Sequence, residues 1–108
     1  MLHELRIYHC APGRLAALNQ RFEHTTLKFW EHYGIKPVGF WTTLVGNSNQ
    51  TLTYMLEWES LAQRETVWGA FSRDPAWLAA RAASEAEAII VERIENSFLV
   101  PTTYSPLR

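Results

Sequence analysis

Residues 36–58 read KPVGFWTTLVG, then NSNQ, then TLTYMLEW, and this stretch decides the fold. Both flanking runs are rich in Val, Thr, Phe, Tyr and Trp, which favour extended strands. The Gly, Asn and Ser residues between them are typical of a turn. The stretch from Lys36 to Trp58 therefore predicts a β-hairpin of two antiparallel strands joined by a tight loop.

The segment before the hairpin predicts one strand and one long helix. Residues 3–9 have the two-residue period of a strand. One face carries His3, Leu5, Ile7 and His9, and the other carries Glu4, Arg6 and Tyr8. Pro12-Gly13 breaks this strand. Apolar residues then recur at helical spacing from Arg14 to Tyr33, and Gly34 predicts the end of this helix because glycine tolerates a positive φ.

The segment after the hairpin predicts two helical pieces. Ser60 is placed to cap the first piece, and Gln63 is placed to reach back to the backbone before it. Asp74-Pro75 is typical of a second helix start, so we expect a break near Arg73. The Ala-rich run of residues 76–88 is expected to continue as helix.

Residues 89–100 are rich in Ile, Val and Phe and predict the last strand, which Pro101 ends before an irregular tail. The resulting order is strand, helix, strand, strand, helix, strand. This is the order of the ferredoxin-like α+β sandwich, a four-stranded antiparallel sheet with its helices on one face. The chain has 108 residues and no internal repeat, so residues 1–108 are expected to form one domain.

The strands of the hairpin are apolar on both faces. In the first run Val38, Phe40 and Leu44 alternate with Trp41 and Val45. A sheet that is apolar on both faces requires a cover on both, and the helices supply only one. A second copy of the chain, packed sheet against sheet about a two-fold axis, would supply the other. The pattern therefore predicts a homodimer.

Composition argues against several classes of partner. The formal net charge is −1, and the Lys and Arg residues are scattered singly, so neither nucleic acid nor an anionic membrane is an expected partner. No apolar run approaches the ~20 residues of a membrane span. Cys10 is the only cysteine, and the sequence from Met1 to Arg6 lacks the features of a signal peptide. These features indicate a protein of the reducing cytoplasm.

Several segments together resemble the NIPSNAP family. They are ELRIY at 4–8, PG at 12–13, VGFWTT at 38–43, Gly46, NQ at 49–50, EWESLA at 57–62 and VPTTYSPL at 100–107. No single segment is specific, but their order and spacing run from one end of the chain to the other. The resemblance implies a dimeric α/β barrel, and most members of this family have no assigned chemistry.

One strand face suggests a ligand site. Glu4, Arg6 and Tyr8 share that face, and Glu57 should lie on a neighbouring strand. A carboxylate, a guanidinium and a phenol lining the inside of a dimeric barrel could orient a small ligand. The alternative is structural: a buried ion pair of Arg6 with Glu4 or Glu57.

The aromatic residues allow two further interpretations. Trp30, Trp41, Tyr54, Trp58 and Trp68 either form ordinary core or line a cleft for a flat, apolar molecule. Trp41 is the best candidate for a pocket, because Gly39 leaves space on the same face. Cys10 has no neighbour that marks it as a nucleophile, and it is interpreted as a small packing residue.

The four histidines do not predict a metal site. His3 and His9 lie ~20 Å apart along an extended strand, and His24 and His32 lie ~12 Å apart along a helix. Neither pair can chelate one ion, and no cysteine cluster assists them. No cofactor is therefore predicted. A single histidine acting as an axial haem ligand or as a base stays open, since some barrels of this superfamily hold haem.

Two functions follow from the sequence and from the resemblance. The first is a protein of NIPSNAP type that binds a small apolar or aromatic molecule or acts as an interaction module. The second is a cofactor-independent oxygenase or isomerase of the same superfamily. In this second function Arg6, Tyr8 and His9 would polarise a substrate carbonyl or phenol.

Overall fold

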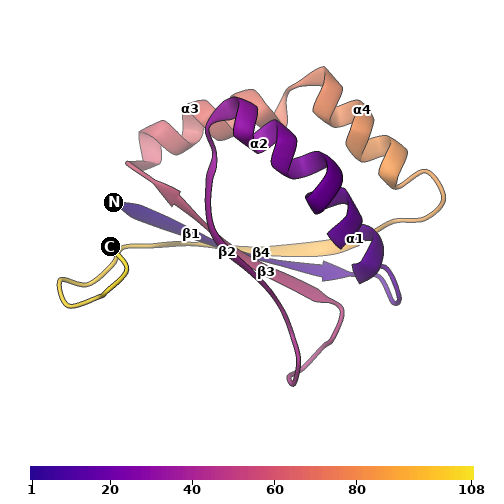
Figure 1. Cartoon of the computed structure of the whole chain (residues 1–108), viewed down its shortest axis with the longest axis horizontal. Helices are drawn as coiled ribbons and strands as arrows, with labels where there is room; N and C mark the ends of the chain where they lie inside the picture. The colour runs from indigo at the N-terminus through magenta and orange to yellow at the C-terminus, as the bar shows by residue number, and fades with distance from the viewer.

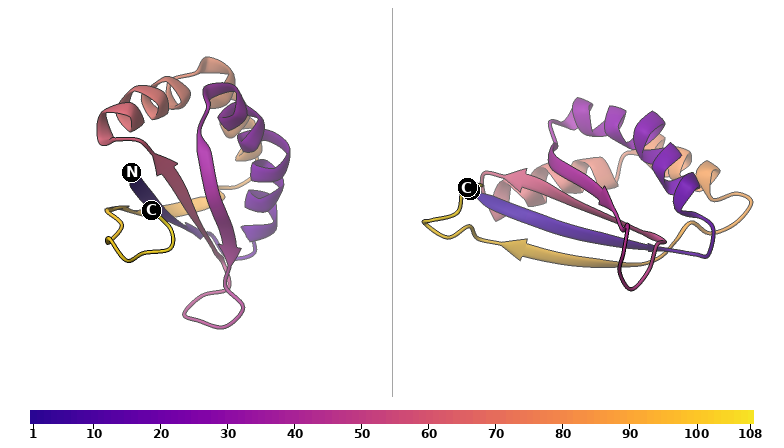
Figure 2. Two further views of the ribbon diagram at one scale, coloured as in Figure 1. Left: turned by 60° about the vertical axis from the view of Figure 1, so that its left-hand side comes forward. Right: turned by 60° about the horizontal axis from the view of Figure 1, so that its bottom comes forward.

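The computed structural model describes residues 1–108 and has a four-stranded antiparallel sheet with every helix on one face (Figures 1 and 2). The elements are β1 (Leu2–Cys10), α1 (Leu15–Arg21), the π-helix η1 (Phe22–Thr26), α2 (Leu27–Tyr33), β2 (Lys36–Thr42), β3 (Thr51–Trp58), α3 (Leu61–Ser72), α4 (Pro75–Ser84) and β4 (Val91–Leu99). The strands lie in the order β2-β3-β1-β4. The predicted ferredoxin-like α+β fold is confirmed.

The long first helix is interrupted by a π-helical turn that the sequence did not predict. Leu18, Phe22, Thr26 and Trp30 are all buried and follow one another at intervals of four residues. In a regular α-helix each such interval turns the side chain by about 40° beyond a full turn, so the stripe would drift off the sheet. The wider turn of η1 absorbs the excess and keeps these side chains directed at the core.

The helix ends follow the predicted capping chemistry. The Ser60 hydroxyl accepts a hydrogen bond from the Gln63 amide at 3.1 Å, and the Gln63 side chain accepts one from the Glu59 amide at 2.7 Å. Asp74 accepts a bond from the Ala76 amide at 2.8 Å, directly before Pro75. Gly34 ends α2 with a φ of 75°. The predicted break near Arg73 is confirmed.

Three predicted boundaries differ from the structure. The last strand, predicted over residues 89–100, spans Val91–Leu99. β2 ends at Thr42, so residues 43–50 form a longer loop than the predicted tight one. Leu44 and Val45, predicted within the strand, are 97% and 92% exposed. The Ala-rich helix ends at Ser84 and not at residue 88, because the alternating Glu and Ala side chains of residues 85–88 present no buried apolar face to the rest of the molecule.

The two faces of the sheet differ in cover. The core lies between the sheet and the helices, where the strands contribute Tyr8, Cys10, Leu52, Tyr54, Leu56 and Trp58. The opposite face carries no helix (Figure 2). Leu5, Ile7 and Met55 on that face are half-buried, and Trp41 is 53% exposed. None of the helices has the combination of length and apolar character that crossing a membrane requires.

Gly34→Ala should lower the free energy of unfolding by about 1–2 kcal/mol, because an L-residue is strained at a φ of 75°. An added Cβ meets no atom within 4 Å, so the effect would come from the backbone alone. Gly69→Ala, inside α3, is the matched control. It should be neutral or stabilising by up to about 1 kcal/mol in urea unfolding. Equal losses in both variants would contradict the assignment of strain to Gly34.

Candidate functional site

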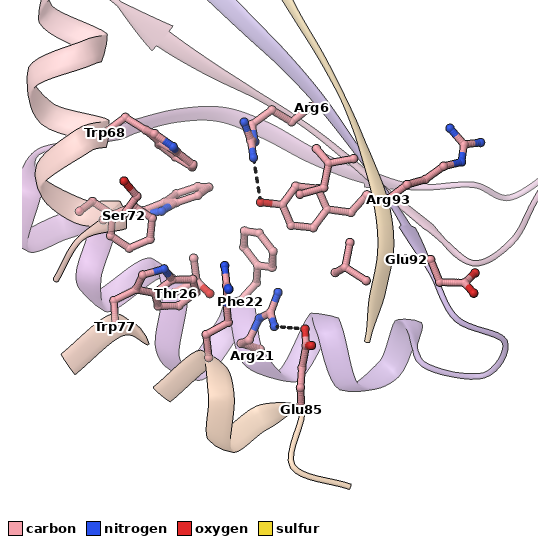
Figure 3. Close-up of a pocket in the computed structure, with 16 residues that line it drawn as sticks. Arg6, Arg21, Phe22, Thr26, Trp68, Ser72, Trp77, Glu85, Glu92 and Arg93 are labelled. Carbon is pink, nitrogen blue, oxygen red and sulfur yellow. Dashed lines mark hydrogen bonds and ion pairs between the residues drawn. The ribbon is translucent and has the colours of Figure 1, made fainter. Parts of the chain in front are cut away.

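A cavity of about 430 Å³ lies between the helices and the β1–β4 edge of the sheet (Figure 3). It forms because β4 is the edge strand and the helices cover it incompletely; Ile94 on its inner face is still 46% exposed. The helices contribute aromatic rings to the wall, namely Phe22, Trp30, Trp68, Phe71 and Trp77. The strands contribute Arg6 and Tyr8. Half of the lining residues are hydrophobic and half are polar or charged, so the cavity offers both aromatic surface and hydrogen-bonding groups to a small molecule.

Arg6 is the central polar residue of this cavity. Its Nε atom donates to the Tyr54 hydroxyl at 2.7 Å, and its Nη2 atom donates to the Tyr8 hydroxyl at 3.3 Å. The Trp68 ring lies 4.7 Å from the guanidinium carbon, within the range of a cation–π contact. Burial alone would lower the pKa of Arg6, but the neighbouring Tyr54, Tyr8 and Glu4 raise it. The guanidinium therefore stays charged.

Glu4 lies behind Arg6 and is fully buried. It accepts hydrogen bonds from Arg6 at 3.1 Å, from the Trp58 indole at 3.0 Å, and from Arg64 at 3.0 and 3.2 Å. Burial would raise its pKa, but the bonds from Arg64 and Trp58 and the two positive charges lower the pKa below its ordinary value. This is the buried ion pair considered above as the structural alternative, with Arg64 as an additional partner.

The structure separates the sequence-predicted site residues into two groups. Glu4, Arg6 and Tyr8 lie together but face the helices, and they do not line the inside of a dimeric barrel as predicted. Trp41 and Glu57 lie on the opposite, uncovered face, where Trp41 folds over Gly39. The error has a physical reason: β1 turns its charged residues towards the helices and its apolar Leu5 and Ile7 towards the uncovered face, and the hairpin strands are apolar on both sides, so the sequence pattern does not distinguish the two faces. A ligand role for each of these residues stays a prediction.

The histidines all lie outside the cavity. His3 and His9 are on the uncovered face of β1, and the His9 ring pairs with Glu95 at 2.5 Å. His24 and His32 are exposed on the first helical stretch. No histidine is therefore placed to act in this cavity as a base or as an axial haem ligand, and His9 is separated from Arg6 and Tyr8 by the sheet. No group of three or more His, Cys, Asp or Glu side chains could hold a metal.

Several residues at the cavity were missed from the sequence. Arg21 is buried and donates to Glu85 at 3.2 Å and to Ser84 at 3.3 Å, which ties the first helix to the end of α4 (Figure 3). Trp77 packs against Phe71 with ring centroids 4.8 Å apart. The sequence offered one indication for Arg21, namely that it directly precedes Phe22, a residue of the predicted apolar helix face. No sequence signal marks Trp77 beyond its place in the first turn after Pro75.

Three buried polar atoms of cavity residues have no hydrogen-bond partner. They are the Nε atom of Arg21, the hydroxyl of Thr26 and the indole nitrogen of Trp30. All three belong to the helical stretch around η1, and their residues line the cavity. Unsatisfied buried polar atoms are uncommon in folded proteins, and π-helical turns concentrate at functional sites. Both observations favour the cavity as the functional part of the molecule.

Burial raises the pKa of the Cys10 thiol, which favours its neutral form. The thiol is buried beside the end of β1 and is absent from the cavity wall. This placement fits the interpretation of Cys10 as a packing residue.

Comparisons with known proteins identify the relatives of this chain. The profile of the NIPSNAP family matches residues 3–106. A crystal structure of a NIPSNAP family protein from Agrobacterium tumefaciens is 27% identical, with a TM-score of 0.83 over 99% of this chain and 98% of that one. An uncharacterized NIPSNAP domain protein from Burkholderia xenovorans is 24% identical, with a TM-score of 0.84 over 98% and 99% of the two chains. The resemblance found in the sequence is confirmed.

A more distant structure shares the fold alone. A putative antibiotic biosynthesis monooxygenase from Nitrosomonas europaea is 7% identical, with a TM-score of 0.63 over 94% of this chain and 98% of that one. No curated protein matches the chain.

Glu4→Gln should lower the free energy of unfolding by about 3–5 kcal/mol, because it leaves the buried guanidinium of Arg6 without a countercharge and removes one of the two carboxylates that pair with Arg64. Glu65→Gln is the matched control: Glu65 contacts the same Arg64 at 3.0 Å but is exposed, so its loss should cost under about 1 kcal/mol. Chemical unfolding at neutral pH measures both changes.

The same carboxylate predicts an acid-sensitive stability. Because the folded-state pKa of Glu4 is below its ordinary value of 4.5, its contribution is present above that pH and is lost as the pH falls through the folded-state pKa. Wild-type protein should therefore lose more stability on acidification than Glu4→Gln. Parallel stability curves for the two proteins would exclude Glu4 as the group responsible.

Proposed function

The chain belongs to the NIPSNAP family, and we propose that it binds a small aromatic molecule in the cavity beneath its helices. The observation that carries this proposal is the aromatic lining of the cavity, which five Phe and Trp rings from the helices supply. Its volume of about 430 Å³ lies within the range of sites for small ligands. Flat rings stacked or packed edge to face against these walls would be bound favourably.

The aromatic wall is held in place by contacts among its own members. Phe22 packs edge to face on Trp30 with centroids 5.5 Å apart, and Phe71 contacts both Trp68, at 5.2 Å, and Trp77. Such mutual packing fixes the rotamers of the rings before a ligand arrives. A preformed apolar site loses less conformational entropy on binding than a flexible one. The wall is therefore suited to binding a rigid aromatic ligand.

We further propose that the chain forms a homodimer through the uncovered face of the sheet. Leu5, Ile7 and Met55 lie on that face and would otherwise meet water. A second copy would cover them about a two-fold axis, as in a dimeric α/β barrel. In this arrangement the two ligand cavities lie on the outer sides of the barrel, beneath the helices of each subunit.

A cofactor-independent oxygenase or isomerase is the second candidate. The observation that favours it is the position of Tyr8 and Arg6 at the wall of an aromatic cavity, where a phenol and a guanidinium could polarise a bound carbonyl. The similarity in fold to a putative monooxygenase is compatible with this candidate. Conversion of an aromatic compound, detected by mass spectrometry and lost in Tyr8→Phe, would support it. A bound ligand recovered unchanged after prolonged incubation with oxygen would favour a binding protein.

Ser72→Phe should abolish binding of an aromatic probe, because the added ring would occupy the cavity that Ser72 lines. The neutral dye N-phenyl-1-naphthylamine is a suitable probe, since its fluorescence rises in an apolar site. We expect at least a tenfold loss of affinity. Thr66→Phe, at an exposed position on the same helix, is the matched control and should bind as wild type does. Undiminished binding to Ser72→Phe would exclude this cavity.

Met55→Lys should convert the dimer to a monomer, because it places a charge on the proposed sheet-to-sheet interface. Leu61→Lys is the control, since Leu61 is an exposed apolar residue on the helical side of the molecule. Native mass spectrometry of wild type should show twice the chain mass, together with any small molecule retained from the cell. A monomeric wild-type protein at micromolar concentration would refute the dimer and leave the cavity proposal standing.

A further inference from the structure

We propose that the molecule bound in this cavity is an aromatic anion, and that the Tyr8 hydroxyl donates a hydrogen bond to its carboxylate or phenolate oxygen. This inference rests on the proposed function, because it names the chemical class of the ligand for the same cavity. It follows from the directions of the hydrogen bonds around Arg6 and from the balance of charge at the cavity wall.

The direction of the bond between the two phenols follows from burial. Tyr54 is fully buried and accepts a hydrogen bond from Arg6 Nε at 2.7 Å. Its own proton has one acceptor within reach, the Tyr8 hydroxyl oxygen at 3.0 Å. Leaving that proton unbonded inside the core would cost about 1–3 kcal/mol. Tyr54 therefore donates to Tyr8.

The Tyr8 oxygen then accepts two hydrogen bonds, one from Tyr54 and one from Arg6 Nη2. A phenol oxygen with two accepted bonds has its lone pairs occupied, and its remaining capacity is its own proton. Tyr8 lines the cavity and has no further hydrogen-bonding partner within the chain. The hydroxyl is therefore left as a donor toward the cavity, and a ligand that displaces water from the cavity would supply the acceptor.

The charge balance at the wall favours an anion. Arg6 and Arg64 share the single buried carboxylate of Glu4, and the second countercharge of Arg64 is the solvent-exposed Glu65, so positive charge exceeds negative charge on the buried side of this cluster. Guanidinium groups offer five N–H donors, and three of the five on Arg6 are used within the chain.

The remaining charged residues of the wall do not reverse this balance. Glu85 is paired with Arg21, and Arg81 adds a further positive charge. The side chains of Glu92 and Arg93 extend away from the enclosed space (Figure 3). No carboxylate is free to receive a cationic ligand, whereas N–H and O–H donors face an anionic one.

Three small molecules of one shape test the inference on unmodified protein. They are naphthalene, 2-naphthoate and 2-naphthylmethylammonium, each measured by displacement of N-phenyl-1-naphthylamine. We expect 2-naphthoate to bind at least tenfold more tightly than the ammonium compound. If naphthalene displaces the dye and 2-naphthoate binds no more tightly than 2-naphthylmethylammonium, the inference is overturned and the proposed function stands. If none displaces the dye, the proposed function fails and the inference fails with it.

The Tyr8→Phe variant measures the contribution of the Tyr8 hydroxyl to ligand affinity. It should weaken 2-naphthoate about tenfold, within the range for a hydrogen bond to a charged group, and leave naphthalene unchanged. Tyr104→Phe removes an exposed phenol from the C-terminal tail and should change neither affinity. Equal affinity of Tyr8→Phe and wild type for 2-naphthoate would overturn the assigned role of Tyr8. The ranking of the three ligands on wild type needs no variant and remains decisive if Tyr8→Phe does not fold.

Discussion

The carboxylate of Glu4 has no access to water, and the side chains around it are arranged to compensate for that. Arg6 reaches it from the same strand, Trp58 from β3 and Arg64 from α3, so one charge connects three elements. Removing an ion from water costs several kcal/mol, and only well-directed hydrogen bonds offset this. The relative position of sheet and helix is therefore fixed here by directional contacts as well as by apolar packing.

The ion pair of Glu4 and Arg6 also fixes the positions of side chains at the cavity. Arg6, once oriented by Glu4, presents its other nitrogens to Tyr54 and Tyr8, and its flat face to Trp68. A buried network in which each member has a partner holds a single geometry, because any rotation would leave a group unsatisfied. The polar end of the cavity is thus rigid, and its aromatic wall is rigid through ring-to-ring contact. Recognition at such a site would depend on shape and on the positions of few atoms.

The sequence predicted the fold well because its signals are local. Gly34, Ser60 and Asp74 end or begin helices through contacts with residues a few positions away, and these contacts are found as expected. The candidate site was predicted only in part. Glu4, Arg6 and Tyr8 share a strand, so their proximity was visible, but Arg64 approaches from sixty residues away and leaves no mark in a periodic pattern. The face of the sheet to which they belong depends on which side the helices pack.

The first helical stretch contains one residue more than a regular α-helix of the same length, and the π-helical turn η1 accommodates this extra residue. Its two flanking α-helical segments are in phase with the core separately, and η1 sets the angle between them. Deleting a single residue within Phe22–Thr26 could restore a regular α-helix in which Leu18 and Trp30, then eleven positions apart, stay within about 20° of one face. Inserting one further residue there would instead rotate one segment relative to the other by about 100°. Either Leu18 or Trp30 would then turn toward solvent. In this fold, insertions are better tolerated in the exposed loop at residues 43–50 than in the first helical stretch, which lines the cavity.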